Sequence, residues 1–520
     1  MVSRISSTFR NRFLPVVSIL LAIALLSAAC GTAPAANPDS APAPATSNDS
    51  TAPTASEEPT EINIMVDYTI AQPPAPDNPV HKEFEKRTNT KLTITWIAGG
   101  DYSDRVNVAL AAGDIPDLIK IPDITAPLFR QMVEQGAFWD LTPYVGEYPN
   151  LMAMNEKIWN NTKINGKSYG VPAGRPMDGG GFVSIRKDWL EKLGIPMPTN
   201  LEELYVAMKA FKENAPDGME NTVGYTMRDS RVMEEIFTGT SGKWKEVDGK
   251  LVNMILEPEM REALVYLNKL YNEGLIPQDF PVMKENQYWE LAAGGRAGVT
   301  SETPEALFRY TMDQWKKNPS VDWTPIVSLA PKPGGKQYVT QGPGFNGILA
   351  IPKTVPEEKM KAILKYIDYG SGGDGLNLTL YGIEGVHYEV VDGLKIANEK
   401  AVADSVGTGS WGKMFSTTVL DLWQYAAGMP KEIYERNISI AQERAKISTG
   451  NPAIGLVSET EIKLGADYNK KIADMKVQTI IGKTSIEEWD AFVQSLKNDP
   501  DYMKIIEEIN AAYAERQSQQ

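Results

Sequence analysis

The sequence is poor in the residues on which thiol and metal chemistry depend. Cysteine occurs once, at Cys30, so no disulfide can form within the chain. Histidine occurs twice, at His81 and His387, and the sequence contains no H-E-x-x-H pair for a catalytic zinc ion. The G-x-S-x-G nucleophile motif and the G-x-x-x-x-G-K-[ST] phosphate loop are also missing. These absences argue against the corresponding hydrolases and nucleotide-dependent enzymes. A glycosidase stays open, because 67 acidic residues always offer carboxylate pairs.

A hydrophobic run stands at the start of the chain, from Phe13 to Cys30. Arg4, Arg10 and Arg12 precede it, and small residues end it. A charged segment, an apolar segment and a small-residue cleavage site are typical of a secretory signal. The run is shorter than the roughly 20 residues that span a bilayer, so a permanent transmembrane helix is the weaker interpretation.

Cys30 stands where such a signal would be cut. The segment SAAC (27–30) resembles the lipobox of bacterial lipoproteins, although Leu26 lies one place further from the cysteine than is usual. The resemblance implies a signal peptide over residues 1–29 and a lipid on Cys30, which would anchor the protein at the extracellular face of the cell membrane. The alternative is an ordinary signal peptide with an incidental cysteine.

The charge balance is acidic. The formal charge is −15, and loss of the three arginines with the signal peptide would take it to −18. An acidic surface argues against nucleic acid as a partner and against electrostatic attachment to anionic lipid.

The segment after Cys30 has no large apolar side chain. Residues 31–60 consist mainly of Ala, Pro, Ser, Thr and acidic residues, which cannot offset the entropy of ordering, so we expect a disordered linker over 30–60. The remaining residues, 61–520, exceed the size at which single cores stop growing, so two lobes are expected.

Strand and helix patterns alternate after Glu61. The patterns predict strands at 62–68, 91–99 and 115–122, helices at 79–89 and 103–112, and later a strand at 348–352 and helices at 260–276, 356–369 and from 417 onward. Thr199 and Glu202 predict a capping box for a further helix. Alternating strands and helices indicate parallel sheets, which bind ligands at the carboxyl ends of their strands. Candidate binding residues after the first strands are therefore Asp67, Tyr68 and Asp123.

Several blocks resemble the extracellular solute-binding proteins of ABC importers, and most closely the large lipoprotein subgroup that serves sugars and oligosaccharides in Gram-positive bacteria. The blocks are ALAAGDIPDLIKI (109–121), GAFWDLTPYVGEYPNL (136–151), NGKSYGVPAG (165–174), residues 181–218, AAGGRAGV (292–299), residues 342–369 and YGIEGVHYEVVDG (381–393). The resemblance implies an α/β, two-lobe periplasmic-binding-protein-like fold of type II. Each lobe would hold a mixed, mainly parallel sheet flanked by helices, with a helix-rich C-terminus. We expect lobe 1 to comprise about 61–178 and 344–400, and lobe 2 about 179–343 and 401–520.

The same resemblance selects further ligand-binding candidates in loops beside these blocks. Arg175 and Asp178 lie where the chain should first cross between lobes, and Phe345 and Asn346 lie near a return crossing. Glu302 follows a strand at a position that lies beside the ligand in similar proteins. Trp411 lies in a Gly- and Ser-rich loop without helical or strand periodicity. For each of them a hinge, turn or packing role is an equally good interpretation.

The family often carries a calcium-binding loop after the position of Pro216. Calcium takes six to eight oxygen ligands. Here Ala215, Met219 and Val223 replace oxygen donors and leave Asp217, Glu220 and Asn221, so a metal-free turn is favoured over a weak site.

These observations predict a monomeric, lipid-anchored receptor. It would deliver a carbohydrate, and more specifically an oligosaccharide, to an ABC permease by hinge closure. It would need no cofactor and would catalyse no reaction. Aromatic rings can cover the apolar faces of a sugar while a few polar groups bind its hydroxyls. Two alternatives stay open. One is a secreted carbohydrate-active enzyme, and the other is the same receptor with a peptide or another metabolite as its ligand.

Overall fold

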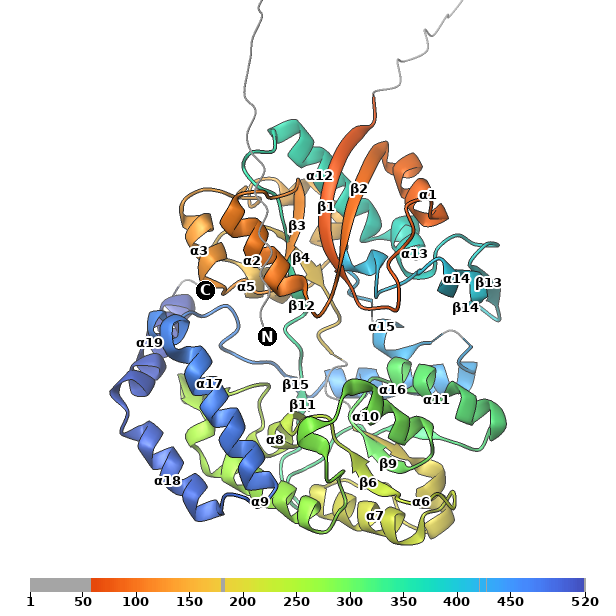
Figure 1. The fold of residues 1–520 in the computed structure, drawn as a ribbon, viewed down its shortest axis with the longest axis vertical. Helices are drawn as coiled ribbons and strands as arrows, with labels where there is room; N and C mark the ends of the chain where they lie inside the picture. The colour runs from red at the N-terminus through yellow and green to blue at the C-terminus, as the bar shows by residue number, and fades with distance from the viewer. Residues whose placement is uncertain (1–57, 179–182, 420, 427, 519–520) are drawn as a thin grey trace, which may run out of the picture. The chain divides into compact units, whose positions relative to one another are not determined.

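The computed structural model describes residues 58–178, 183–419, 421–426 and 428–518 (Figure 1). The predicted signal peptide, Cys30 and the linker as far as residue 57 lie outside these residues. No helix in the described part of the chain combines the length and the apolar character that crossing a membrane requires.

A five-stranded sheet forms the centre of the first lobe. Its strand order is β2-β1-β3-β12-β4, and β1 pairs in parallel with both β2 and β3, while β12 runs antiparallel to β3 and β4. The strands are β1 (Thr60–Tyr68), β2 (Thr90–Ala98), β3 (Leu118–Ile121), β4 (Val171–Gly174) and β12 (Phe345–Ala350). The strands expected at 62–68, 91–99, 115–122 and 348–352 therefore exist and share one sheet.

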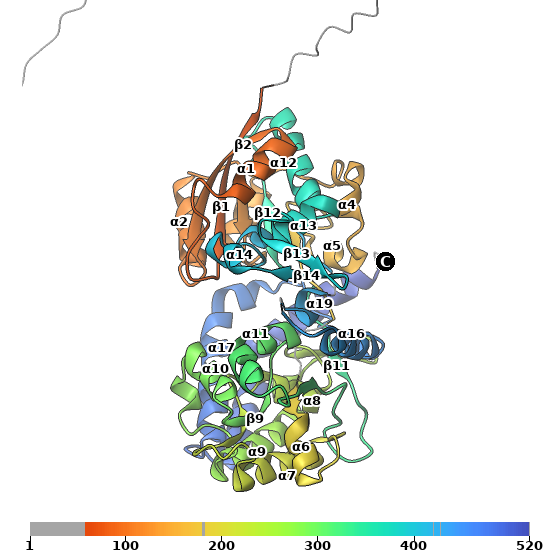
Figure 2. The same cartoon turned by 90° about the vertical axis from the view of Figure 1, so that its right-hand side faces the viewer.

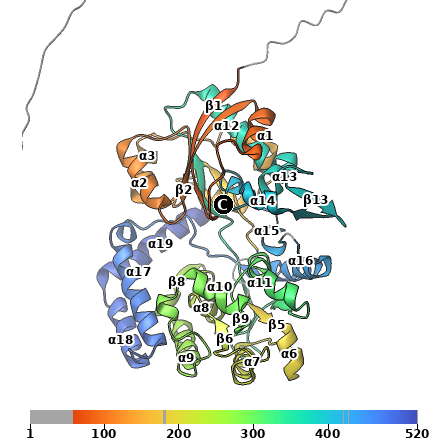
Figure 3. The same cartoon turned by 45° about the vertical axis from the view of Figure 1, so that its right-hand side comes forward.

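The alternation of side chains along β1 explains why helices cover both faces of this sheet. Ile62, Ile64 and Val66 enter the core on one face, and Met65 enters the core on the other. Figure 3 shows α2 and α3 on one side of the sheet and α1 and α12 on the other. The first-lobe helices are α1 (Pro79–Thr88), α2 (Tyr102–Ala112), α3 (Pro127–Glu134), η1 (Val145–Glu147), α4 (Pro149–Met152), α5 (Glu156–Thr162), α12 (Glu357–Gly370), α13 (Gly373–Tyr381), α14 (Glu399–Ala403) and η4 (Trp411–Lys413).

A β-hairpin lies beside α13 and α14 (Figure 2). Its strands are β13 (Tyr388–Val391) and β14 (Leu394–Ala397), which pair antiparallel. The buried His387 fixes the base of the hairpin, because its Nδ1 accepts the Ile383 N–H at 2.9 Å and its Nε2 lies 2.9 Å from Asp404.

A four-stranded sheet forms the centre of the second lobe. Its order is β10-β5-β9-β6, with β6 and β9 parallel and β5 antiparallel to β9 and β10. The strands are β5 (Ser184–Arg186), β6 (Val223–Thr226), β9 (Ala297–Thr300) and β10 (Trp323–Pro325). Two of the three pairings are antiparallel, so this sheet is mixed but not mainly parallel as expected. A hairpin outside this sheet consists of β7 (Trp244–Val247) and β8 (Lys250–Asn253), which pair antiparallel.

The C-terminal helices complete the second core. Tyr468, Trp489 and Ile505 from three successive helices pack into the same buried cluster as Leu204 and Val299. The second-lobe helices are α6 (Lys187–Leu193), α7 (Leu201–Asn214), α8 (Arg231–Thr238), η2 (Met254–Leu256), α9 (Pro258–Asn272), η3 (Phe280–Val282), α10 (Glu285–Ala293), α11 (Pro304–Lys317), α15 (Asp421–Gln424), α16 (Lys431–Ala445), α17 (Glu459–Ile480), α18 (Ile486–Lys497) and α19 (Pro500–Ser518).

Helix α7 begins one residue later than the predicted capping box. Asn200 is the N-cap, and its side chain accepts the backbone N–H groups of Glu202 and Glu203. Thr199 instead donates its N–H and hydroxyl to the Glu203 carboxylate. Both Thr and Asn can cap a helix, and here the Asn side chain reaches the first free N–H groups.

The expected lobe boundaries stay a prediction, but core packing bears on one of them. Trp411, Met414 and Phe415 belong to the same buried cluster as Val66 and Phe84 of the first lobe. Residues 411–415 therefore pack with lobe 1, although the sequence placed all of 401–520 in lobe 2. This packing would move the last crossing between lobes beyond residue 415.

Candidate functional site

The strand directions place the ends of several strands beside the segments that cross between the lobes. In the first lobe Gly174, at the end of β4, pairs with Phe345, at the start of β12, and Ile121 pairs with Ile348. In the second lobe Thr300, at the end of β9, pairs with Ser184, where β5 begins after the first crossing. The carboxyl ends of β3 and β4 and of β9 therefore lie on the sides of the lobes that the crossings join, where α/β proteins bind ligands.

Asp67, predicted as a ligand contact, lies at the end of β1 and is held by two lysines. Its Oδ1 accepts a hydrogen bond from Lys120 Nζ at 2.7 Å, and its Oδ2 lies 3.2 Å from Lys413 Nζ. Burial raises the pKa of Asp67, but the two ammonium groups more than offset this and hold the pKa below its ordinary value. Asp67 is thus an ionised, paired carboxylate.

Arg175 joins this group from the end of β4. Its guanidinium donates to the carbonyl oxygens of Gly174 at 2.7 Å and Gly412 at 2.9 Å. With its amide oriented so that both neighbours are satisfied, Asn346 donates to the Ala173 carbonyl oxygen at 3.2 Å and accepts from Arg175 Nη2 at 3.3 Å. The structure therefore brings Asn346 onto Arg175, and Asp67 lies near enough to act electrostatically on the Arg175 guanidinium.

Asp178 lies on the first crossing segment and forms hydrogen bonds with two segments that are distant in sequence. Its Oδ1 accepts hydrogen bonds from Gln341 Nε2 at 3.1 Å and Ser448 Oγ at 2.6 Å. Ser448 belongs to β15 (Ser448–Thr449), which pairs in parallel with β11 (Val339–Thr340) just before Gln341. These contacts agree with the hinge role that was the alternative to ligand contact for Asp178.

Glu302 lies at the end of β9 in the second lobe. Its Oε1 is 3.9 Å from Arg228 Nη1, in the loop that follows β6. Beside it, the Tyr225 and Ser301 hydroxyl oxygens are 2.5 Å apart. The second lobe thus offers a mixed acidic and basic pair at its strand ends.

The other predicted residues differ in exposure. Tyr68 and Phe345 are half-buried, and Asn346 and Asp123 are exposed. Asp123 accepts the N–H of Thr125 at 2.8 Å and its hydroxyl at 2.6 Å, so it stabilises its own turn.

Trp411 requires a correction. It is 0 % exposed and its ring stacks on Phe84 with centroids 5.6 Å apart. A side chain without exposed surface offers nothing to a ligand, so Trp411 packs the core of the first lobe. Its short 3-10 helix carries no periodic pattern, which is why the sequence did not place it there.

The loop after α7, for which the sequence favours a metal-free turn over a weak calcium site, has a guanidinium beside it. Asp217 accepts a hydrogen bond from the buried Arg186 at 2.9 Å and another from Trp189 Nε1 at 3.0 Å. Glu220 and Asn221 are exposed. Among the described residues, no three His, Cys, Asp or Glu side chains are grouped to hold a metal ion.

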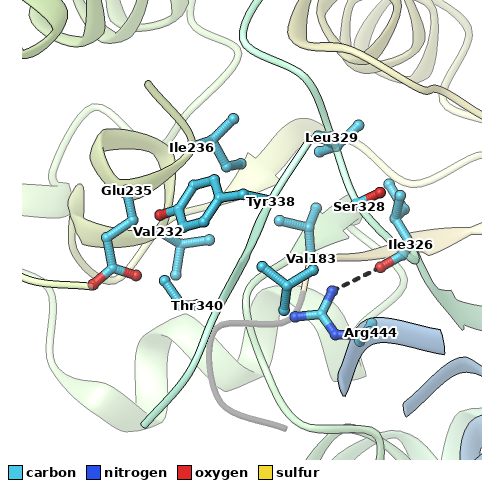
Figure 4. A pocket seen from close by; sticks show the side chains of 11 residues that line it. Val183, Val232, Glu235, Ile236, Ile326, Ser328, Leu329, Tyr338, Thr340 and Arg444 are labelled. Carbon is cyan, nitrogen blue, oxygen red and sulfur yellow. Dashed lines mark hydrogen bonds between the residues drawn. The ribbon is translucent and has the colours of Figure 1, made fainter. Parts of the chain in front are cut away.

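Among the hollows in the described part of the second lobe are two that no predicted site residue lines. One has a volume of about 30 Å³ and lies between Val183, Tyr338 and Arg444, which donates to the Ile326 carbonyl at 2.9 Å (Figure 4). It has room for water but not for a sugar. The other, of about 490 Å³, lies among α8, α9 and α17, and its Lys476 is paired with Glu234 at 2.7 Å.

Lys120 and Lys413 are the site residues that sequence reasoning missed. Lys120 stands in LIKI, a strand buried at all four positions, where a charged residue is unusual. That contrast could have revealed it. Lys413 is the last residue of the short helix η4, two places after Trp411, and gave no comparable signal.

The comparison with protein families decides the identification. The family of bacterial extracellular solute-binding proteins matches residues 68–372. The chain belongs to this family. Its members are binding proteins, which agrees with the absence of the catalytic motifs sought above.

Two relatives and one solved structure extend this result over most of the solute-binding protein. "Lipoprotein LipO" of Bacillus subtilis is 30% identical over 481 residues, covering 90% of this chain and 95% of the relative. "Polygalacturonan/rhamnogalacturonan-binding protein YtcQ", also of Bacillus subtilis, is 32% identical over 452 residues, covering 85% and 89%. The structure of an HMO-binding, ABC-transporter-associated solute-binding protein from Bifidobacterium longum infantis is 19% identical with a TM-score of 0.68, covering 88% of this chain and 99% of that one. This structural similarity confirms the two-lobe fold.

Proposed function

We propose that this solute-binding protein captures an oligosaccharide between its two lobes and delivers it to the permease of an ABC transporter without changing it chemically. The observation that carries the proposal is the arrangement of polar side chains at the strand ends of both lobes. In the first lobe Asn346 contacts Arg175, and Asp67 acts electrostatically on the same guanidinium. In the second lobe Arg228 lies beside Glu302. Such groups bind sugar hydroxyls.

The relatives support a carbohydrate rather than a peptide. YtcQ is named for binding polygalacturonan and rhamnogalacturonan and is 32% identical to this chain. A "Fructooligosaccharide ABC transporter substrate-binding protein FusA" of Streptococcus pneumoniae is 21% identical over 483 residues. Both names refer to saccharide chains, which favours an oligosaccharide.

We propose that closure of the two lobes about a hinge is the mechanism of ligand capture. Ligand bound to one lobe would gain contacts with the other lobe on closure, and closure proceeds only as far as the ligand prefers the closed state. We further propose that the protein acts as a monomer and is held at the extracellular face of the cell membrane by a lipid on Cys30. The name of LipO supports the anchor.

A panel of neutral and acidic oligosaccharides tests this function. We expect saturable binding by isothermal titration calorimetry and, with the same ligand, a smaller radius of gyration in small-angle X-ray scattering. Chromatography after prolonged incubation should recover the sugar unchanged. Saturable binding by peptides alone would contradict the carbohydrate ligand, and cleaved sugar would show an enzyme instead.

A further inference from the structure

Two lysines bind a single carboxylate at the candidate site, and an arginine lies near enough for that carboxylate to act on its charge. We call Lys120, Arg175 and Lys413 the basic cluster, and Asp67 is the acid at its centre. Lys120 donates to Asp67 at 2.7 Å and Lys413 lies 3.2 Å from it, whereas Arg175 binds backbone carbonyl oxygens instead of a second acid. Among the described residues, Asp67 is the acid that acts electrostatically on all three.

The basic cluster carries two more positive charges than Asp67 can balance. Its members are buried, with 4 % of the Lys120 side chain and 12 % of the Lys413 side chain exposed. Buried charges without partners are costly. Burial accordingly lowers the pKa of Lys120 to about 8 and that of Arg175 to about 10. An excess of positive charge is unexpected in a chain whose formal charge is −15.

The position of the cluster links this charge to the ligand. Asp67 ends β1, Arg175 follows β4, and Lys120 lies next to the end of β3, so all three elements present the cluster at the edge where a ligand is expected. Lys413 is more exposed than Lys120 and approaches from the loop around η4. An anionic group that arrives with the ligand would supply the missing negative charge.

We propose that the ligand is an acidic oligosaccharide and that one of its uronate carboxylates binds at the basic cluster. The inference rests on the proposed carbohydrate function and adds the class of sugar. Charge-assisted hydrogen bonds from ammonium and guanidinium groups to a carboxylate are stronger than neutral ones. The carboxylate would therefore contribute both affinity and selection against neutral sugars.

The direct test compares trigalacturonate with its fully methyl-esterified form, which has the same sugar rings without the charges. We expect the acid to bind the wild-type protein at least tenfold more tightly in calorimetry. Lys413→Met should weaken binding of the acid by about tenfold and weaken binding of the ester much less, because the lost charge acts mainly on the carboxylate. The matched control is Lys86→Met, which removes a lysine that is 77 % exposed on the same lobe and should change neither affinity.

A pH series tests the part of Lys120. A bound carboxylate favours the protonated ammonium, so binding should take up protons near pH 8 and affinity should fall as the pH rises above the pKa of Lys120, about 8. Calorimetry at pH 8.5 in two buffers of different ionisation enthalpy measures this uptake. Binding of the ester should show no uptake.

The outcomes separate the two proposals. Equal or tighter binding of the ester would overturn the acidic ligand and leave the carbohydrate function intact. Binding of a trisaccharide that carries sulfate groups but no carboxylates, without binding of trigalacturonate, would overturn the proposal that the basic cluster binds a carboxylate. Failure of every saccharide would overturn both proposals. The comparison of acid with ester uses the wild-type protein, so it decides the question even if Lys413→Met fails to fold.

Discussion

At the scale of single residues, Arg186 shows how a buried charge is accommodated when its partners are at hand. Its side chain is 0 % exposed and lies 2.5 Å from Asp188 and 2.9 Å from Asp217. The guanidinium also lies over the Trp189 ring, 4.4 Å from its centroid. Arg186 therefore stabilises the turn after α7 with a positive charge, in the loop for which the sequence favoured a metal-free turn over a weak calcium site.

Replacing Arg186 tests this role. We expect Arg186→Gln to lower the free energy of unfolding by about 3 kcal/mol, because it removes a buried cation that pairs with the two partly exposed carboxylates of Asp188 and Asp217. Chemical denaturation followed by circular dichroism measures the loss. The same substitution at the exposed Arg261–Asp490 pair should cost less than about 1 kcal/mol. Similar losses at both positions would contradict the buried role of Arg186.

At the scale of elements, a side chain of α19 caps the start of α17. Glu508 accepts hydrogen bonds from Ser458 Oγ at 2.5 Å and from the Thr460 N–H at 2.9 Å. Ser458 is itself the N-cap of α17 and accepts the Glu461 N–H. These bonds, the Ser458 bond first, lower the pKa of Glu508 from 4.5 to about 2. The ionised carboxylate thus joins two helices of the second core.

The low pKa makes this contribution depend on pH. Because the folded state holds the pKa below its ordinary value, the stabilisation is complete above about pH 5 and is lost as the pH falls from 4.5 to about 2. The Glu508 side chain is 26 % exposed, so we expect Glu508→Gln to cost only about 1 kcal/mol at pH 7.

Urea denaturation at pH 7 and at pH 3 measures this difference. The gap between Glu508→Gln and wild type should shrink at pH 3. Substitution of the neighbouring exposed Glu507 by Gln should have little effect at either pH. A gap that stayed constant with pH would show that the charge of Glu508 is not what joins the helices.

At the scale of the whole molecule, a two-lobe binding domain follows the segment that we propose to direct export and anchoring. The domain needs no disulfide, because each lobe has its own buried core. The proposed anchor at Cys30 is separated from β1 by about thirty residues of linker sequence. Such a linker would let the domain reach its ligand and the permease while it stays at the membrane.

Cys30→Ser tests the anchor. Without a thiol the lipid cannot be attached, and we expect the protein to move from the membrane fraction to the medium when both are immunoblotted. A Ser47→Ala variant, altered within the linker, should stay with the membrane fraction. If Cys30→Ser also stays there, an uncleaved hydrophobic segment and not a lipid holds the protein.

The sequence by itself determined the local elements, the family and the two-lobe fold. Hydrophobic periodicity predicted the strand at 348–352 and the helix at 356–369, because it depends on neighbours along the chain. Only the tertiary structure decided which distant residues meet. It brought Lys120 and Lys413 into contact with Asp67, buried Trp411 against Phe84, and bonded Asp178 to Ser448. The physical reason is that these contacts depend on how sheets and loops pack, which no local pattern encodes.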